Sequence, residues 1–358
     1  MCTISGLANG TMYKIAVRAS NIKGTGRASK PLKVTLSYNF ADPVAEAFDG
    51  THVWVLNDQG NSVTEFNASD GSWVQTLGGA PYGFDHPSAI TFDGSHLWVT
   101  NSGFDNSVTE FNASGGSWVQ TLRGGSYGFD GVDGITYDGT HLWATNGVGN
   151  SVTEFNASDG SWVRTIQNAT YGFDSPSAIT FDGTHLWVAN SFSGSMSAGD
   201  SLTEINASDG SYVQQLYDPS TWDFCNPTTI AFDGTNLWVT NECGGSVTEF
   251  RSSDGSFVQR LSNNTGNYGF ASPTGSTFDG SHIWVTNLFA NNRMSSVTEF
   301  NTSDGSPVRT LQGAPYNFLA SAAVIHDGTH LWVTNSAGKG GSVTEIDASD
   351  GSFVQILP

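Results

Sequence analysis

The chain has 358 residues, of which only 13% are charged, and its 13 basic and 33 acidic residues give a net charge of −20 at pH 7. All the acidic residues and seven of the basic ones lie beyond residue 40, so that part carries a net −26. Such a surface repels phosphate backbones and anionic lipid headgroups, which argues against a nucleic-acid partner. No apolar stretch approaches the roughly 18 residues of a membrane-spanning helix, so we expect no membrane insertion.

Residues 1–40 carry six basic side chains and no acidic ones, and we expect them to form a short β segment. The runs 3–21 and 24–35 resemble the last three strands of a fibronectin type III domain, with Leu7 and Tyr13 where that family has its tyrosine corner. The resemblance covers half of such a domain and implies that its first four strands precede this chain. Half a sandwich cannot bury its core, so we expect the segment to lean on the remainder, to pair between chains or to be poorly ordered.

Residues 43–358 contain seven copies of one unit, roughly D-G-T-H-L-W-V-T-N followed by S-V-T-E-F-N-A-S-D-G-S-W-V-Q-T-L. The D-G aspartates lie 44 to 51 residues apart, at Asp49, Asp93, Asp138, Asp182, Asp233, Asp279 and Asp327. This period is typical of propeller blades, and each unit contains four β-branched or aromatic runs joined by turn residues. We therefore predict an all-β chain: a seven-bladed β-propeller of four-stranded antiparallel blades over 43–358, preceded by the N-terminal segment. The repeat begins and ends in phase, so no strand exchange between the first and last blades is obvious, and the sequence does not show how the ring closes.

Residues shared by all seven copies are explained first by a shared structural need. The second predicted strand always contains a tryptophan, for which we predict packing between blades rather than a row of ligand platforms: Trp54, Trp98, Trp143, Trp187, Trp238, Trp284 and Trp332. The T-E glutamates are expected to hydrogen-bond to backbone: Glu65, Glu110, Glu154, Glu204, Glu249, Glu299 and Glu345. Six turn histidines, with Asn236 as the seventh, are interpreted as structural: His52, His96, His141, His185, His282 and His330. The two remaining histidines are His326, interpreted as a core substitution for Phe or Tyr, and His86, in a loop between blades.

The positions of two cysteines indicate the cellular compartment in which the protein works. Cys225 and Cys243 lie symmetrically about Gly234, the centre of the fifth D-G turn, and so face each other in a regular hairpin. Cross-strand Cβ atoms about 4.5 to 5.5 Å apart allow a disulfide, which we predict here. A disulfide favours an oxidising compartment, so we expect an extracellular or cell-wall-associated protein with any signal peptide upstream of this chain.

Loops that are longer than their counterparts in the other repeats indicate a candidate ligand site. The loops that join strands two and three, and those that join successive blades, emerge on one face, and the longest are 191–200, 217–227, 262–272 and 288–296. We expect the candidate ligand-binding residues to lie together on this side: Phe192, Trp222, Asp223, Phe224, Glu242, Phe289 and Arg293. Aromatic faces with a few polar groups suit a carbohydrate, a peptide or a small amphipathic ligand. Loops that diverged under no functional constraint are the competing interpretation.

The motif P-x-x-I-x-x-D-G-x-x-L-W-V-T-N, as in 87–101, resembles the repeats of the seven-bladed propellers related to streptogramin lyases. It also resembles those of the broader NHL and YVTN-type repeat proteins. Such lyases are expected to hold a divalent cation with a histidine and glutamates in the channel. Glu242 follows the strand-two asparagine as a lyase glutamate does, but no histidine accompanies it. The resemblance is specific for fold and weak for function.

Two main functions follow, and an enzyme is the less favoured one. The first is an extracellular, noncatalytic propeller that binds its ligand or a protein through the irregular loops of blades 4 to 6, with no cofactor expected. The second is a metal-assisted lyase or hydrolase acting on a cyclic ester, for which a divalent cation is possible. Its candidate acids, bases or ligands are Glu242, Asp223, His86 and Asp58. A structural spacer that binds no ligand is the third possibility.

Overall fold

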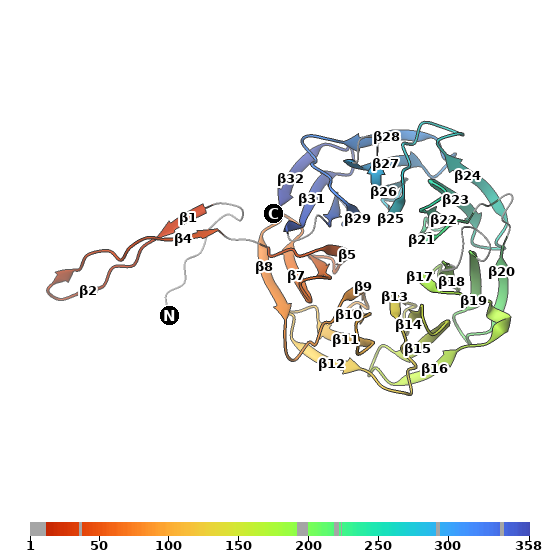
Figure 1. Ribbon diagram of the computed structural model, residues 1–358, viewed down its shortest axis with the longest axis horizontal. Helices are drawn as coiled ribbons and strands as arrows, with labels where there is room; N and C mark the ends of the chain where they lie inside the picture. Colours follow the sequence, from red (N-terminus) through yellow and green to blue (C-terminus); the bar gives the residue numbers. More distant parts are fainter. Residues whose placement is uncertain are drawn as a thin grey trace.

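The computed structural model describes residues 12–35, 38–191, 200–217, 222, 224–290, 294–336 and 340–358. In this part of the chain, seven four-stranded antiparallel sheets form a closed ring, and each sheet is one blade (Figure 1). The described helix is a single 3-10 turn, η1 (Ala169–Tyr171). Within the same residues no helix has the length and apolar character to cross a membrane. The predicted seven-bladed propeller is confirmed.

Each blade is a simple meander from the centre of the ring to its rim. The first strands line the centre: β5 (Pro43–Phe48), β9 (Pro87–Phe92), β13 (Val132–Tyr137), β17 (Pro176–Phe181), β21 (Pro227–Phe232), β25 (Pro273–Phe278) and β29 (Ser321–His326). The second strands are β6 (His52–Asn57), β10 (His96–Asn101), β14 (His141–Asn146), β18 (His185–Asn190), β22 (Asn236–Asn241), β26 (His282–Ala290) and β30 (His330–Asn335).

The outer half of each blade carries the remaining two strands. The third strands are β7 (Ser62–Asn67), β11 (Ser107–Asn112), β15 (Ser151–Asn156), β19 (Ser201–Asn206), β23 (Ser246–Arg251), β27 (Met294–Asn301) and β31 (Ser342–Asp347). The fourth strands form the rim: β8 (Trp73–Gly78), β12 (Trp118–Leu122), β16 (Trp162–Ile166), β20 (Tyr212–Leu216), β24 (Phe257–Ser262), β28 (Pro307–Gln312) and β32 (Phe353–Leu357).

The core lies between neighbouring blades. The tryptophan of every second strand is fully buried, and Trp54 of blade 1 packs on Leu97 and Phe111 of blade 2, with 5.4 Å between the Trp54 and Phe111 ring centroids. The second and third strands are buried on both faces, which explains their nearly unbroken apolar and Thr-rich sequence. The predicted role of these tryptophans in packing between blades is confirmed.

The ring closes without strand exchange, because β5 to β8 and β29 to β32 each make a complete blade. At the seam between blades 7 and 1, Tyr38 and Phe40 pack with Phe66 and Trp332. The Tyr38 hydroxyl donates to the carbonyl of Gly71, as Tyr82 does to Gly116 at the next junction. The backbone N–H of Tyr38 donates to the carbonyl of Pro358 over 3.4 Å, so the two ends of the propeller meet there.

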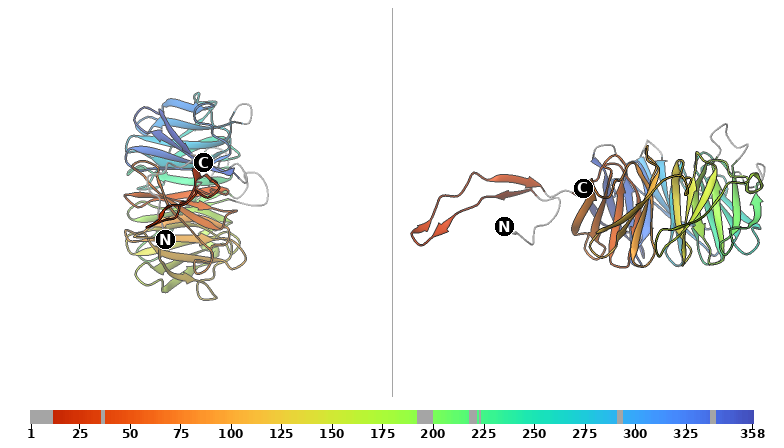
Figure 2. Two further views of the ribbon diagram at one scale, coloured as in Figure 1. Left: turned by 90° about the vertical axis from the view of Figure 1, so that its left-hand side faces the viewer. Right: turned by 90° about the horizontal axis from the view of Figure 1, so that it is seen from below.

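The N-terminal segment is a thin two-stranded ribbon. Strand β1 (Met12–Ile15) pairs antiparallel with β4 (Leu32–Thr35), and β2 (Ser20–Asn21) pairs with β3 (Gly24–Thr25). Figures 1 and 2 show the ribbon extending outward from the ring near blade 1. Ile15 is half-buried and residues 16–31 are exposed. The ribbon does not lean on the propeller, and its fibronectin-like origin stays a prediction.

Candidate functional site on the loop face

The meander gives the ring two different faces. Connections between strands one and two and between strands three and four lie on one face, here called the turn face. Connections between strands two and three and between successive blades lie on the other, here called the loop face. Figure 2 shows the ring edge-on, with the two faces on opposite sides.

The turn face repeats one hydrogen-bond network in each blade. In blade 1, Asp49 Oδ1 accepts the backbone N–H groups of Thr51 and His52 at 2.8 and 2.7 Å. Its Oδ2 accepts the Trp54 indole N–H at 2.8 Å and lies 3.2 Å from His52 Nδ1. Glu65 Oε1 lies 3.6 Å from the same His52 nitrogen. The network anchors the buried tryptophan and the tight turn, which supports the structural interpretation of the turn histidines.

The strand-three glutamates bind side chains, not the backbone that the sequence suggested. Glu65 Oε2 accepts the Gln75 amide at 2.6 Å, and the guanidinium Nε of Arg164 lies 2.6 Å from Glu154 Oε2. The expectation was wrong because the register places a long polar side chain of the fourth strand directly opposite each glutamate. Burial raises the pKa of all seven glutamates above the usual range.

The loop face places two sequence-predicted residues together. His86 Nδ1 lies 2.9 Å from Asp58 Oδ1, and Asn61 accepts the backbone N–H of His86 at 2.8 Å. Asp42 belongs to the same region, since its carbonyl accepts the Asp58 N–H at 2.9 Å. Of the four catalytic candidates, Asp58 and His86 thus form a pair at the junction of blades 1 and 2, whereas Glu242 lies in blade 5 and Asp223 lies outside the described residues.

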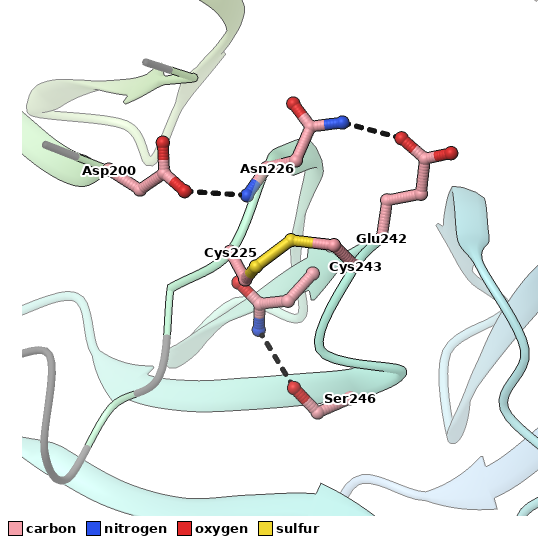
Figure 3. Close-up of a disulfide and its surroundings, with 7 residues drawn as sticks. Asp200, Cys225, Asn226, Glu242, Cys243 and Ser246 are labelled. Carbon is pink, nitrogen blue, oxygen red and sulfur yellow. Dashed lines mark hydrogen bonds between the residues drawn. A yellow bond between two sulfur atoms is a disulfide. The ribbon is translucent and has the colours of Figure 1, made fainter. Parts of the chain in front are cut away.

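Blade 5 carries a covalent constraint on the loop face. Cys225 and Cys243 form the predicted disulfide, with Cα atoms 5.4 Å apart. Directly beside it, the Asn226 side-chain amide donates to Glu242 Oε2 at 2.5 Å, and the Glu242 N–H donates to the Asn226 carbonyl (Figure 3). The buried Asp200 carboxylate of blade 4 accepts the Asn226 N–H at 2.7 Å. Glu242 is therefore held by Asn226 through both its side chain and its backbone, and Asn226 is held in turn by Asp200.

A pocket of about 400 Å³ opens next to this constraint, between the end of blade 5 and the loop 262–272. Its polar lining comes from Glu242, Arg260, Asn263 and Asn264, together with serines. Arg260 stands on β24 at the position held by Thr76, Thr121, Thr165 and Thr310 in other blades. The Asn263 side chain fixes the loop, because it donates to the Phe270 carbonyl at 2.8 Å and accepts the Phe270 N–H at 3.0 Å.

The predicted aromatic residues behave differently from one another. Phe224 is only 2% exposed and stacks on Phe250, and half-buried Trp222 packs edge-on against the same ring at 5.5 Å. Both belong to the core between blades 4 and 5, because Trp222 takes the place of the junction tyrosines such as Tyr82. Phe192, Asp223 and Arg293 lie outside the described residues, and Phe289 lies near the end of β26.

Two carboxylates of the first strands were missed by the sequence reasoning. Asp133 of β13 occupies the position of Ser88, and Glu46 of β5 occupies the position of Ile90. Burial raises the pKa of Asp133 to about 6 and that of Glu46 well above its usual range. The two Glu46 carboxylate oxygens are buried and accept no hydrogen bond from the described residues. Aligning the seven first strands would have revealed both departures.

Comparison with known proteins identifies the architecture. No protein-family model and no curated protein matches the sequence. Among solved structures, a Kuenenia stuttgartiensis hydrazine synthase chain is similar with a TM-score of 0.68 and 18% identity over 88% of this chain and 98% of that one. A streptogramin B lyase follows with a TM-score of 0.65 and 17% identity, over 87% of this chain and 94% of the lyase. Virginiamycin B lyase from Staphylococcus aureus gives 0.61 and 16%, over 82% and 91% of the two chains. At these identities the likeness concerns the propeller fold alone.

Proposed function

We propose that this chain is an extracellular or cell-wall-associated, noncatalytic binding propeller that holds a polar ligand in the pocket beside Glu242. The observation that carries the proposal is the coincidence of the disulfide and the pocket in one blade. A disulfide next to a polar concavity keeps its walls in place before a ligand arrives, which lowers the entropic cost of binding. Disulfides also persist in oxidising compartments, which supports the proposed location.

The lining favours a hydroxyl-rich or amide-rich ligand, namely a carbohydrate or a peptide. Glu242 offers carboxylate acceptors, Asn263 and Asn264 offer amides, and Arg260 brings a guanidinium to the same pocket. The apolar members Phe270 and Ala271 are few, and Phe270 is almost fully buried. A large apolar ligand would find little surface here, whereas several hydrogen bonds could orient a sugar or a peptide backbone.

The test starts from glycan and peptide arrays, followed by calorimetry on the strongest hit. Glu242→Gln combined with Asn264→Ala should weaken binding about tenfold or more, because hydrogen bonds to charged groups contribute about 1.5–3 kcal/mol each. Asp58→Asn removes the carboxylate from the equivalent position of blade 1 and serves as the charge-matched control, with unchanged affinity expected. Equal affinity of the double variant and the native protein would refute the placement of the site.

A second candidate, a metal-assisted lyase or hydrolase of a cyclic ester, is favoured by the Asp58–His86 pair. A carboxylate at 2.9 Å from Nδ1 orients the imidazole and leaves its other nitrogen available as a base or metal ligand. Incubation of the purified protein with lactone and depsipeptide substrates, with and without Mg²⁺, tests this function. Turnover that disappears in His86→Ala would support it, and no turnover with any of these substrates would count against it.

A further inference from the structure

The N-terminal ribbon, residues 12–35, and the propeller carry opposite charge. The basic residues of the ribbon are Lys14, Arg18, Lys23, Arg27, Lys30 and Lys33, and it contains no acidic residue. The first five of these side chains are exposed, and none of the five forms an ion pair within the part of the chain that the structure describes. The propeller has seven basic and 33 acidic residues, a net −26. The charges that could attract each other are thus separated along one chain.

The ribbon lacks contacts that would stabilise it. In the register of β1 with β4, Ile15 pairs with Leu32, and the neighbouring pair is Lys14 with Lys33. An isolated two-stranded ribbon is at best marginally stable in water, and like charges directly opposite each other weaken it further. Ile22, in the turn between β2 and β3, is fully exposed at the tip. A surface that offers carboxylates and an apolar contact would offset these effects.

One patch on the loop face of blades 2 and 3 has this composition. Phe104 is 99% exposed and Val148 is 72% exposed, which makes them the two most exposed large apolar side chains among the described residues of the propeller. Each has an exposed aspartate beside it. Asp105 follows Phe104 in the chain, and the Asp130 carbonyl accepts the Val148 N–H at 3.2 Å. These four residues are here called the blade 2–3 patch.

Hydrogen bonds join the loops that carry the patch. Asp85 Oδ2 accepts the Phe104 N–H at 2.9 Å, and Asn106 Oδ1 accepts the Gly131 N–H at 2.8 Å. The Gly131 carbonyl accepts the Gly147 N–H at 2.8 Å. These bonds connect the blade 2 loop, the connection between the blades and the blade 3 loop. The patch is therefore held in place before a partner arrives, which lowers the entropic cost of binding.

Charge identifies the ribbon of a second copy as the occupant. Two ribbons repel each other because both are purely basic, whereas a ribbon meets opposite charge on the patch. Arg123 Nη1 lies 3.3 Å from Asp105 Oδ2, but this single cation is outnumbered by Asp85, Asp105 and Asp130. Charges are screened beyond about 8 Å at physiological ionic strength, so local attraction outweighs the repulsion between two chains of net charge −20. The ribbon extends outward from its own ring, where a neighbouring molecule can reach it (Figure 2).

We propose that the tip of the ribbon, residues 18–27, binds the blade 2–3 patch of a second copy of this chain. Ile22 packs on Phe104 and Val148, and the three cations of the tip lie beside the aspartates. The contact joins different surfaces of the two copies, so it forms rings or open chains rather than a closed dimer. A hairpin tip buries less than the roughly 1,200 Å² of a standard interface, so association is weak and reversible. The patch is separate from the pocket of blade 5.

Sedimentation velocity of the full chain tests the contact, in a Cys2→Ser background that excludes dimers linked through that cysteine. The weight-average mass should rise with protein concentration up to about 500 µM, as for a weak interface. It should fall when NaCl is raised from about 0.05 M to about 0.5 M, because salt screens the attraction. Phe104→Ser should raise the apparent Kd at least tenfold. Leu319→Ser removes an exposed apolar side chain from another junction of the loop face and should leave association unchanged.

A charge exchange separates this contact from general aggregation. Lys23→Glu with Arg27→Glu reverses the ribbon, and Asp105→Lys with Asp130→Lys reverses the patch. Each double variant alone should be monomeric, and an equimolar mixture of the two should associate again, because each reversed surface then meets its opposite. The proposal is overturned if the native chain stays monomeric at every concentration, if association strengthens with salt, or if the mixture fails to associate. Loss of association in Leu319→Ser equal to that in Phe104→Ser would also overturn it.

Discussion

The seam between blades 7 and 1 and the six other blade junctions use the same packing with different chain connectivity. At the junction of blades 1 and 2, Tyr82 and Phe84 pack on Phe111, and the chain runs on from β8 without a break. At the seam, Tyr38 and Phe40 make the equivalent contacts with Phe66 and Trp332, but they come from the other end of the propeller sequence. Closure therefore depends on side-chain packing and hydrogen bonds, with no covalent link across the seam.

One residue makes the seam less favourable than the other junctions. Glu46 stands where Ile90 and its equivalents present apolar side chains or a hydroxyl, and the nearby Thr334 hydroxyl offsets only part of the rise in pKa that burial causes. The described strands packed against β5 are β6, β9, β29 and β30. Their ionisable side chains are His52, His326 and His330, and none of these contributes to the pKa shift of Glu46. A buried carboxyl that makes no hydrogen bond of ordinary geometry with the described residues, and that only the Thr334 hydroxyl helps to stabilise among the named neighbours, thus lies at the seam.

Removal of an aromatic anchor should produce the largest effect. Phe40→Ala should lower the free energy of unfolding by about 3–5 kcal/mol, because it leaves a cavity at a fully packed position. Phe84→Ala is the matched change at a covalently continuous junction. Urea denaturation of both variants measures the comparison, and we expect the seam variant to lose at least as much stability. A much smaller loss for Phe40→Ala would show that Phe40 contributes little to closure.

The disulfide of blade 5 is a covalent constraint that the seam lacks. Replacing both cysteines, Cys225→Ser with Cys243→Ser, should lower stability by about 2–4 kcal/mol through the greater entropy of the unfolded chain. The bridge closes a sequence separation of 18 residues, which is within the range for that estimate. Differential scanning calorimetry of the variant against native protein with and without reductant checks the value. Native protein that reductant leaves unchanged would contradict an accessible structural disulfide.

Glu46→Ile should make the seam resemble the other junctions. At pH 7 we expect a gain of about 1–3 kcal/mol, since the variant removes a buried carboxyl whose cost of burial the Thr334 hydroxyl offsets only in part. The pKa of Glu46 in the folded protein is raised above its ordinary 4.5, so its contribution to stability is fully present below that pH and is lost as the pH rises through the folded pKa. The gain from Glu46→Ile should therefore shrink toward pH 4. Melting temperatures measured from pH 4 to pH 8 test this, and a gain independent of pH would contradict it.

The smallest expected effect concerns a polar contact across the seam. Ser336 Oγ donates to Asp42 Oδ1 at 2.5 Å and reaches the Pro43 carbonyl at 3.0 Å. Ser336→Ala should lower stability by about 0.5–1.5 kcal/mol, the net contribution of a typical hydrogen bond. Ser102→Ala removes the hydroxyl from the equivalent position of blade 2, where it donates to the His86 carbonyl. Equal losses in the two variants would mean that the seam has no special dependence on this contact.

Sequence periodicity was sufficient for the architecture and for part of the candidate site. The D-G spacing predicted seven blades, and the symmetry of Cys225 and Cys243 about Gly234 predicted the disulfide. The aromatic candidates were less predictable, because Phe224 and Trp222 lie in a long loop of the sequence yet fill the junction position of Tyr-x-Phe in the fold. That motif recurs before every blade, so a longer repeat unit would have identified both as core residues.

By itself, the sequence determined how many blades there are, which turns connect their strands and which tryptophans lie between them, because these depend on local turn chemistry repeated at a fixed period. Only the tertiary structure decided how the ring closes, which carboxylates are buried and which departures share a pocket. Glu46 and His326 are visible in the sequence only as departures from the repeat. Their chemistry arises from neighbours in another blade, and such neighbours are brought together by closure of the ring rather than by proximity along the chain.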